Sequence, residues 1–129
     1  FLKKYRFRVQ TAIKLIDGLA EVIKTSPSPE QYAVQLKDPL EPEYGLRPMG
    51  LLANGMLSSE NTGLTNELLL ARWYINEISL QVSDIRVAKS ETDALSSYLA
   101  AKKAVNSYLS ILNRQITAKV GNQFTYLSI

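Results

Sequence analysis

The chain has 129 residues, a net charge of +3, and a composition of 46% hydrophobic and 21% charged residues, which is typical of one globular domain. It contains neither histidine nor cysteine, which excludes imidazole ligation of metals, disulfides, thiolate nucleophiles and iron–sulfur clusters. No apolar run approaches the roughly 20 residues that a membrane-spanning helix needs. We therefore expect a single domain over residues 1–129 that does not span a membrane.

The first predicted helix covers residues 2–25. Its apolar residues recur at alternating steps of three and four, as in a helix that packs along its whole length; they are Leu2, Tyr5, Val9, Ala12, Ile16, Leu19 and Ile23. Gly18 lies inside this pattern and lowers helix stability by about 1 kcal/mol relative to alanine. Pro27 and Pro29 end the helix, because proline cannot continue it.

The second helical region, residues 29–58, is irregular. Ser28 is a candidate N-cap, Pro29 suits the first helical position, and Gln31 would complete a capping box. This start predicts a short helix to about residue 37. The chain is then interrupted repeatedly, and a second helical piece is expected over residues 49–58. The interrupting residues are Pro39, Pro42, Gly45 and Pro48.

Two further helices are predicted over residues 65–89 and 91–120. The stripe of the first is Leu64, Leu68, Ala71, Ile75, Ile78, Val82 and Ile85. The stripe of the second, interrupted by Lys102, is Leu95, Tyr98, Val105, Leu109, Leu112 and Ile116. The short connection at Ser90 makes these helices antiparallel neighbours, and Gly121 is available as a left-handed cap of the last helix. The pattern predicts an all-α fold: an up-down-up-down four-helix bundle with an irregular, proline-broken second helix region.

Trp73 and the C-terminal tail each have two possible interpretations. Trp73 either packs at the core boundary, which we favour, or is exposed and marks a partner surface. The C-terminal tail, residues 121–129, alternates apolar and polar residues at its end. It either folds back over the bundle, which we favour, or inserts into a partner.

No motif for catalysis or cofactor binding is present. A di-iron bundle needs Glu-x-x-His pairs, and the phosphate-binding glycine loop and the nucleophile elbow are also absent. Glu77 and Asp84 lie seven residues apart on one helix face, and we interpret them as solvated charges rather than a metal site. We therefore predict no enzymatic activity, no catalytic or cofactor-binding residues, no metal ligands and no cofactor.

The positive charge is concentrated at the start of the chain, where residues 1–24 carry six cations against two acids. Three interpretations are open: a solvated helix end, docking to an acidic protein surface, or binding of nucleic acid or anionic lipid. We favour the acidic protein surface over nucleic acid as a partner, because only one end of the chain is basic. The candidate partner-binding residues are Lys3, Lys4, Arg6, Arg8, Lys14, Lys102 and Lys103.

Three segments carry a resemblance to a known family. They are Leu2-Lys3-Lys4-Tyr5-Arg6-Phe7-Arg8, then Glu67-Leu68-Leu69-Leu70-Ala71-Arg72-Trp73-Tyr74, and the stretch from Tyr98 to Arg114. Together with the helix plan, the proline-interrupted first connection and the basic beginning, they resemble the extrinsic, lumen-facing subunits of photosystem II of the PsbQ-like type. This family includes a related four-helix-bundle subunit of diatom-type algae.

The resemblance implies a non-enzymatic protein of the chloroplast thylakoid lumen. Such a protein would bind the photosystem II core and other extrinsic subunits, and would support oxygen evolution by stabilising the surroundings of the manganese cluster. It would help to retain calcium and chloride there without ligating metal itself. The alternatives are a general helical adaptor or chaperone-like interaction module, and a binder of nucleic acid or anionic membranes driven by the basic end.

Overall fold

The computed structural model describes residues 2–57 and 65–129. The fold is all-helical, and the described residues contain no strand. In chain order the elements are α1 (Leu2–Asp17), α2 (Leu19–Thr25), η1 (Pro29–Gln31), α3 (Tyr32–Gln35), η2 (Pro42–Tyr44), α4 (Leu46–Leu57), α5 (Thr65–Arg86) and α6 (Glu91–Asn113).

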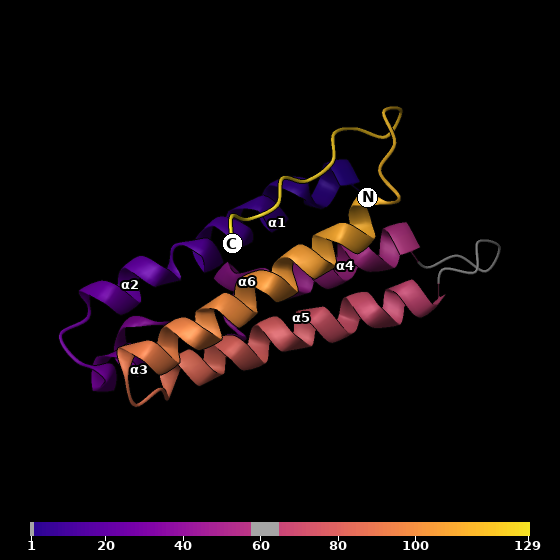
Figure 1. Ribbon diagram of the computed structural model, residues 1–129. Coiled ribbons are helices and arrows are strands. Elements are labelled where there is room, and N and C mark those ends of the chain that lie inside the picture. Colours follow the sequence, from indigo (N-terminus) through magenta and orange to yellow (C-terminus); the bar gives the residue numbers. More distant parts are fainter. Residues whose placement is uncertain (1, 58–64) are drawn as a thin grey trace.

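The long helices lie lengthwise beside one another (Figure 1). α1 and α2 follow each other along one edge, and α5 and α6 are antiparallel neighbours that share the most extensive helix–helix contact. α4 packs against both α1 and α5. The short elements η1 and α3 lie near the end of the molecule where α5 turns into α6. None of the helices in the described part of the chain is long and apolar enough to cross a membrane.

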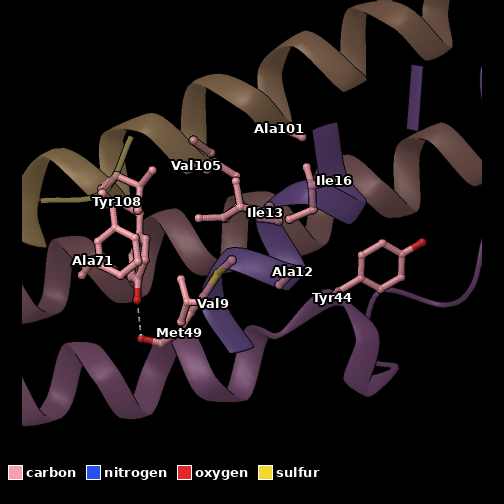
Figure 2. Close-up of a cluster of buried hydrophobic side chains, with 14 of the residues drawn as sticks. Val9, Ala12, Ile13, Ile16, Tyr44, Met49, Ala71, Ala101, Val105 and Tyr108 are labelled. Atoms are coloured by element: carbon pink, nitrogen blue, oxygen red, sulfur yellow. Dashed lines mark hydrogen bonds between the residues drawn. The ribbon is translucent and has the colours of Figure 1, made fainter. Parts of the chain in front are cut away.

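The core forms where α1, α4, α5 and α6 meet (Figure 2). Every residue of the first predicted stripe is buried, from Leu2 to Ile23, which confirms that prediction. Val9, Met49, Val105 and Tyr108 are all fully enclosed. The Tyr108 hydroxyl donates a hydrogen bond to the Met49 carbonyl at 2.7 Å, which joins α6 to α4 within the core.

The prediction of one continuous helix over residues 2–25 is wrong at Gly18. There the Glu21 amide bonds the Gly18 carbonyl instead of the Asp17 carbonyl, so the α-helical pattern is interrupted. The free Asp17 carbonyl accepts a hydrogen bond from the Tyr98 hydroxyl at 2.6 Å. Two features therefore occur together at the interruption: Gly18 is a poor helix former, and the Asp17 carbonyl, which lacks its helical partner, is satisfied by a side chain of α6.

The second region is irregular, as predicted, but its details differ. A helical segment starts at Pro29 after Ser28, yet no side-chain cap bond forms, and α3 ends at Gln35 rather than near residue 37. α4 begins at Leu46, three residues earlier than expected. Pro48 is accommodated because it lies in the first helical turn, where its missing N–H has no intrahelical partner. The expected end of this helix at residue 58 lies outside the described residues.

The last two helices are shorter than predicted. α5 ends at Arg86 instead of residue 89, and the Arg86 guanidinium donates to the Leu36 and Ala33 carbonyls near the end of α3. α6 begins after Ser90, whose side chain accepts a hydrogen bond from the Asp93 amide, as an N-cap does. It ends at Asn113 instead of residue 120. Gly121 is therefore no helix cap; its φ is 150° and it lies outside the left-handed helical region.

The buried face of α6 is rotated relative to the predicted stripe. Val105, Leu109 and Leu112 are buried as expected, and so is Ile116 beyond the end of the helix, but Leu95 and Tyr98 are only partly buried. Small residues and one tyrosine take their place in the core. These residues are Ala94, Ala101, Ala104 and Tyr108. In the α5 stripe, Ile75 is partly buried and Leu64 lies outside the described residues, whereas the other members are buried.

The C-terminal tail folds back, as predicted. After α6 the chain reverses and runs along the molecule beside α1 (Figure 1). Phe124 is the anchor of this segment, with only 4% of its surface exposed. The tail therefore covers one side of the contact between α1 and α6 instead of projecting into solvent.

Candidate functional site

The outward surface of α1 has an exposed aromatic residue at its centre. At 100° per residue, Phe7 lies almost opposite the buried side of α1 that Leu2, Val9 and Ile16 form. Phe7 is accordingly 78% exposed, whereas Tyr5, two residues earlier, is buried against the core. Single exposed apolar side chains are common on protein surfaces, so the significance of Phe7 depends on the residues and grooves around it.

Four of the predicted partner-binding cations surround Phe7, and all four are exposed. Lys3 precedes Phe7 by four residues and Lys14 follows it by seven, so the three lie along one line of the helix surface. Lys4 and Arg8 occupy the adjacent line. We call Lys3, Lys4, Phe7, Arg8 and Lys14 the α1 face. It combines clustered positive charge with one large apolar side chain.

Two grooves meet at Phe7. The first, with a volume of about 360 Å³, lies between α1 and the C-terminal tail and includes Lys14, Phe124 and Tyr126 in its lining. The second, of about 470 Å³, lies between α1 and the segment that leads from Leu40 into α4. Phe7 and Thr11 line both grooves and form the ridge between them.

The second groove is amphipathic. Its apolar wall includes Leu46 and Leu51, and Leu40 stands at its rim with 82% of its surface exposed. The groove is also lined by charged residues of both signs. Arg8 and Arg47 are positive, and Glu41 and Glu43 are negative. The ammonium group of Lys37 lies 2.6 Å from Glu43 Oε1, and this hydrogen bond is the largest cause that holds the pKa of Glu43 below its usual value.

Arg6 differs from the other cations at this end of α1. Its guanidinium lies 4.6 Å from the centre of the Phe124 ring and donates a hydrogen bond to the Asn122 carbonyl. Both partners belong to the C-terminal tail. Arg6 therefore fixes the tail, and the α1 face does not include it.

Lys102 does not extend the α1 face, and Lys103 belongs to a different helix, α6. The Lys102 ammonium lies 3.9 Å from the Asp17 carboxylate, at the opposite end of α1, and 5.0 Å from the centre of the Tyr98 ring. Only 13% of its side chain is exposed. Lys103 is exposed on α6, one helical turn before Asn106, which binds the tail. The structure thus separates Lys102 from the cluster around Phe7.

The outer side of α5 is a second exposed apolar surface. Trp73 is 55% exposed and packs edge-to-face on Tyr74, with ring centres 5.3 Å apart. The prediction that Trp73 packs at the core boundary is therefore wrong: it points outward, close to the direction opposite the core. Other exposed apolar residues of α5 are Leu69, Leu70 and Leu80. A shallow, open hollow of about 560 Å³ lies on this surface and is lined by Asn66, Leu69, Leu70, Trp73 and Tyr74. Its lining contains no charged side chain, whereas the α1 face combines an exposed aromatic residue with four cations, so the α1 face is the stronger candidate.

No protein-family model, curated protein or solved structure matches the chain. Within residues 2–57 and 65–129, no three acidic side chains come close enough together to hold a metal ion.

Sequence reasoning identified the cations of the α1 face but not the centre of that face. Phe7 was visible as an aromatic residue among charges, and its position off the apolar stripe was the signal that it points outward. The grooves could not be predicted, because one wall comes from the C-terminal tail and the other from the segment before α4. Both segments lie far from α1 in the sequence.

Proposed function

We propose that this protein is a non-enzymatic docking subunit whose α1 face binds an acidic protein surface. The observation that carries the proposal is Phe7, 78% exposed between two grooves and surrounded by four exposed cations. Clustered cations accelerate and orient the encounter with an acidic surface. An aromatic side chain that enters an apolar pocket of the partner then supplies most of the binding free energy.

The partner that we propose is the lumenal side of photosystem II. The sequence resemblance to PsbQ-like extrinsic subunits supports this choice, and so does the lengthwise packing of four rods: α1 with α2, then α4, α5 and α6. We infer an up-down-up-down four-helix bundle from that packing and from the antiparallel pair α5 and α6. In this role the protein resides in the thylakoid lumen and helps to retain calcium and chloride near the manganese cluster without ligating metal.

The test is binding to photosystem II core particles that have been stripped of their extrinsic subunits. We expect saturable binding of the unaltered chain, and a loss of affinity of roughly tenfold or more in K4E/R8E and in F7A. The matched control is K24E/K89E, which changes the net charge as much as K4E/R8E does but alters exposed lysines away from the α1 face. This control should bind as the unaltered chain does.

Two outcomes would contradict the proposal in different ways. Absence of binding to core particles would reject photosystem II as the partner. Equal binding by K4E/R8E and K24E/K89E would reject the α1 face as the docking surface. Duplex DNA and vesicles with anionic lipid serve as comparison ligands, and binding to them should fall steeply as the salt concentration rises. Tighter binding to either than to core particles, at physiological salt, would favour the nucleic-acid or membrane alternative.

A further inference from the structure

The C-terminal tail is bound to the rest of the protein in the way that a peptide is bound by a receptor. The chain reverses after α6, and residues 122–129 then run antiparallel to that helix, between it and α1 (Figure 1). Residues 117–120, which connect the two parts, are exposed. The tail is therefore an extended segment that is held by defined contacts and joined to the helices by an exposed connection.

Two asparagine side chains of α6 bind the backbone of the tail. Asn113 Nδ2 donates to the Phe124 carbonyl at 3.1 Å, and the Phe124 amide donates to Asn113 Oδ1 at 2.8 Å. Asn106 repeats this pattern with Leu127, at 3.0 Å and 2.8 Å. Each side-chain amide thus pairs with both backbone groups of one residue, as a neighbouring β-strand would.

The spacing of the two asparagines matches an extended peptide. Asn106 and Asn113 are seven residues apart, or about 10.5 Å along an α-helix. Phe124 and Leu127 are three residues apart, or about 10 Å along an extended chain. Because these two lengths agree, both asparagine side chains can pair with the extended backbone at the same time. These contacts select an extended backbone and do not read side-chain identity.

Side-chain selection comes from two positions of the tail. Phe124 is 4% exposed and lies beneath the Arg6 guanidinium, and Leu127 is partly buried against the core. Between them, Thr125 and Tyr126 are exposed. The segment that fits is therefore an aromatic residue, two unrestricted residues and an aliphatic residue, all in extended conformation.

We propose that the surface formed by Arg6, Asn106 and Asn113 is a peptide-binding site for extended aromatic-x-x-aliphatic segments, and that residues 122–129 are its resident ligand. Asn113 supports this assignment, because it is 4% exposed and both of its amide atoms are satisfied by the tail. The site adjoins the α1 face, because the tail forms one wall of the groove that Phe7 and Lys14 also line. The same segment supplied as a separate peptide should occupy it.

The test starts from the full chain. Residues 117–120 are replaced by the recognition sequence of a site-specific protease, a change that an exposed connection tolerates. After cleavage, a fluorescent peptide with the sequence of residues 121–129 is added and its anisotropy is measured. We expect saturable uptake by the cleaved protein in exchange for the original segment, and no uptake by the uncleaved protein, whose site is filled by a tethered ligand.

Variants of the peptide and of the protein separate specific binding from non-specific adsorption. F124A in the peptide and N106A or N113A in the protein should each weaken binding about tenfold or more, because each removes buried contacts or two hydrogen bonds. T125A in the peptide is the matched control and should bind as the unaltered peptide does. Where N113A fails to fold, as judged by circular dichroism, N106A supplies the same comparison at a less buried position.

The proposal would be overturned if the F124A peptide bound as tightly as the unaltered one, or if N106A had no effect in a protein that remains folded. Unfolding of the helices upon release of the segment would also overturn it, since the tail would then be an integral part of the core. Exchange of tails between two intact copies, detected as a dimer by light scattering, would support it.

Discussion

Gly45 lies directly against Ala12. Its backbone has a φ of 63°, in the left-handed region, and a Cβ placed on it would overlap the Cβ of Ala12 on α1. Gly45 ends η2 and directly precedes α4. This one residue therefore allows both the turn into α4 and the close approach of that turn to α1.

Two glycine-to-alanine changes should have opposite effects. G45A should lower the free energy of unfolding by more than about 1 kcal/mol, because alanine is strained at positive φ and has no space beside Ala12. G50A, within α4, should raise it by about 0.5–1 kcal/mol, since a Cβ there meets nothing within 4 Å and alanine favours the helix. Urea unfolding followed by circular dichroism measures both. A stabilising G45A would show that α4 does not approach α1 as described.

The hydrogen bond between Tyr108 and Met49 makes a separable contribution to stability. Y108F keeps the buried ring but removes the hydroxyl, and should lower the free energy of unfolding by about 1–2 kcal/mol. Y108A also removes the ring from the core and should cost about 3–5 kcal/mol. Thermal unfolding of the unaltered chain, Y108F and Y108A measures how much stability each substitution removes. Equal stability of Y108F and the unaltered chain would mean that this hydroxyl does not join α6 to α4.

The raised pKa of Tyr98 predicts that the protein loses stability at high pH. Burial, followed by the negative charge of Asp17 and the hydrogen bond to its side chain, raises the pKa of Tyr98 from 10.0 to about 12. The folded state therefore retains the phenolic proton more tightly than the unfolded state does. The stability from this group is complete below about pH 10 and is lost as the pH rises through 12.

Alkaline titration monitored by tyrosinate absorbance tests this prediction. In Y98F the group with a midpoint near pH 12 should be missing, while the decline of stability between pH 10 and 12 becomes shallower. Y126F is the control, because Tyr126 is half exposed on the tail. A Tyr98 that ionises together with exposed tyrosines would contradict its placement beside Asp17.

Trp73 provides a built-in reporter, since the chain has a single tryptophan. Its indole is 55% exposed on the outer side of α5, so its fluorescence should be quenched readily by acrylamide and by iodide. Docking through the α1 face should leave this quenching unchanged. Strong protection of Trp73 in the bound state would instead assign docking to α5, and W73A would then weaken binding more than F7A does.

The sequence was most informative where apolar residues repeat over many turns. The seven residues from Leu2 to Ile23 all proved to be buried, because a long periodic stripe leaves few alternatives for which side of a helix meets the core. The start of the last helix at residue 91 was also predicted correctly, because the N-cap bond of Ser90 involves only residues within one turn. The cations of the α1 face could also be recognised, because helical spacing alone determines that Lys3, Phe7 and Lys14 are neighbours.

Helix ends and the boundaries of the site depended on distant contacts. α6 ends at Asn113, whose carbonyl accepts a hydrogen bond from the Gln123 side chain and whose own side chain binds the backbone of Phe124, eleven residues later. α1 is interrupted at Gly18, where Tyr98 supplies a donor to the Asp17 carbonyl. Lys102 and Arg6 were assigned to the basic surface from charge alone, but pairing with Asp17 and with the tail removes them from the cluster around Phe7.

The sequence by itself therefore determined the all-helical class, the buried side of the first helix and the basic beginning of the chain. These properties follow from spacing within single helices. Only the tertiary structure decided which cations remain available, where the grooves beside Phe7 lie and how the tail is held. Those depend on hydrogen bonds and packing between residues far apart in the chain, which periodicity and local propensity do not encode.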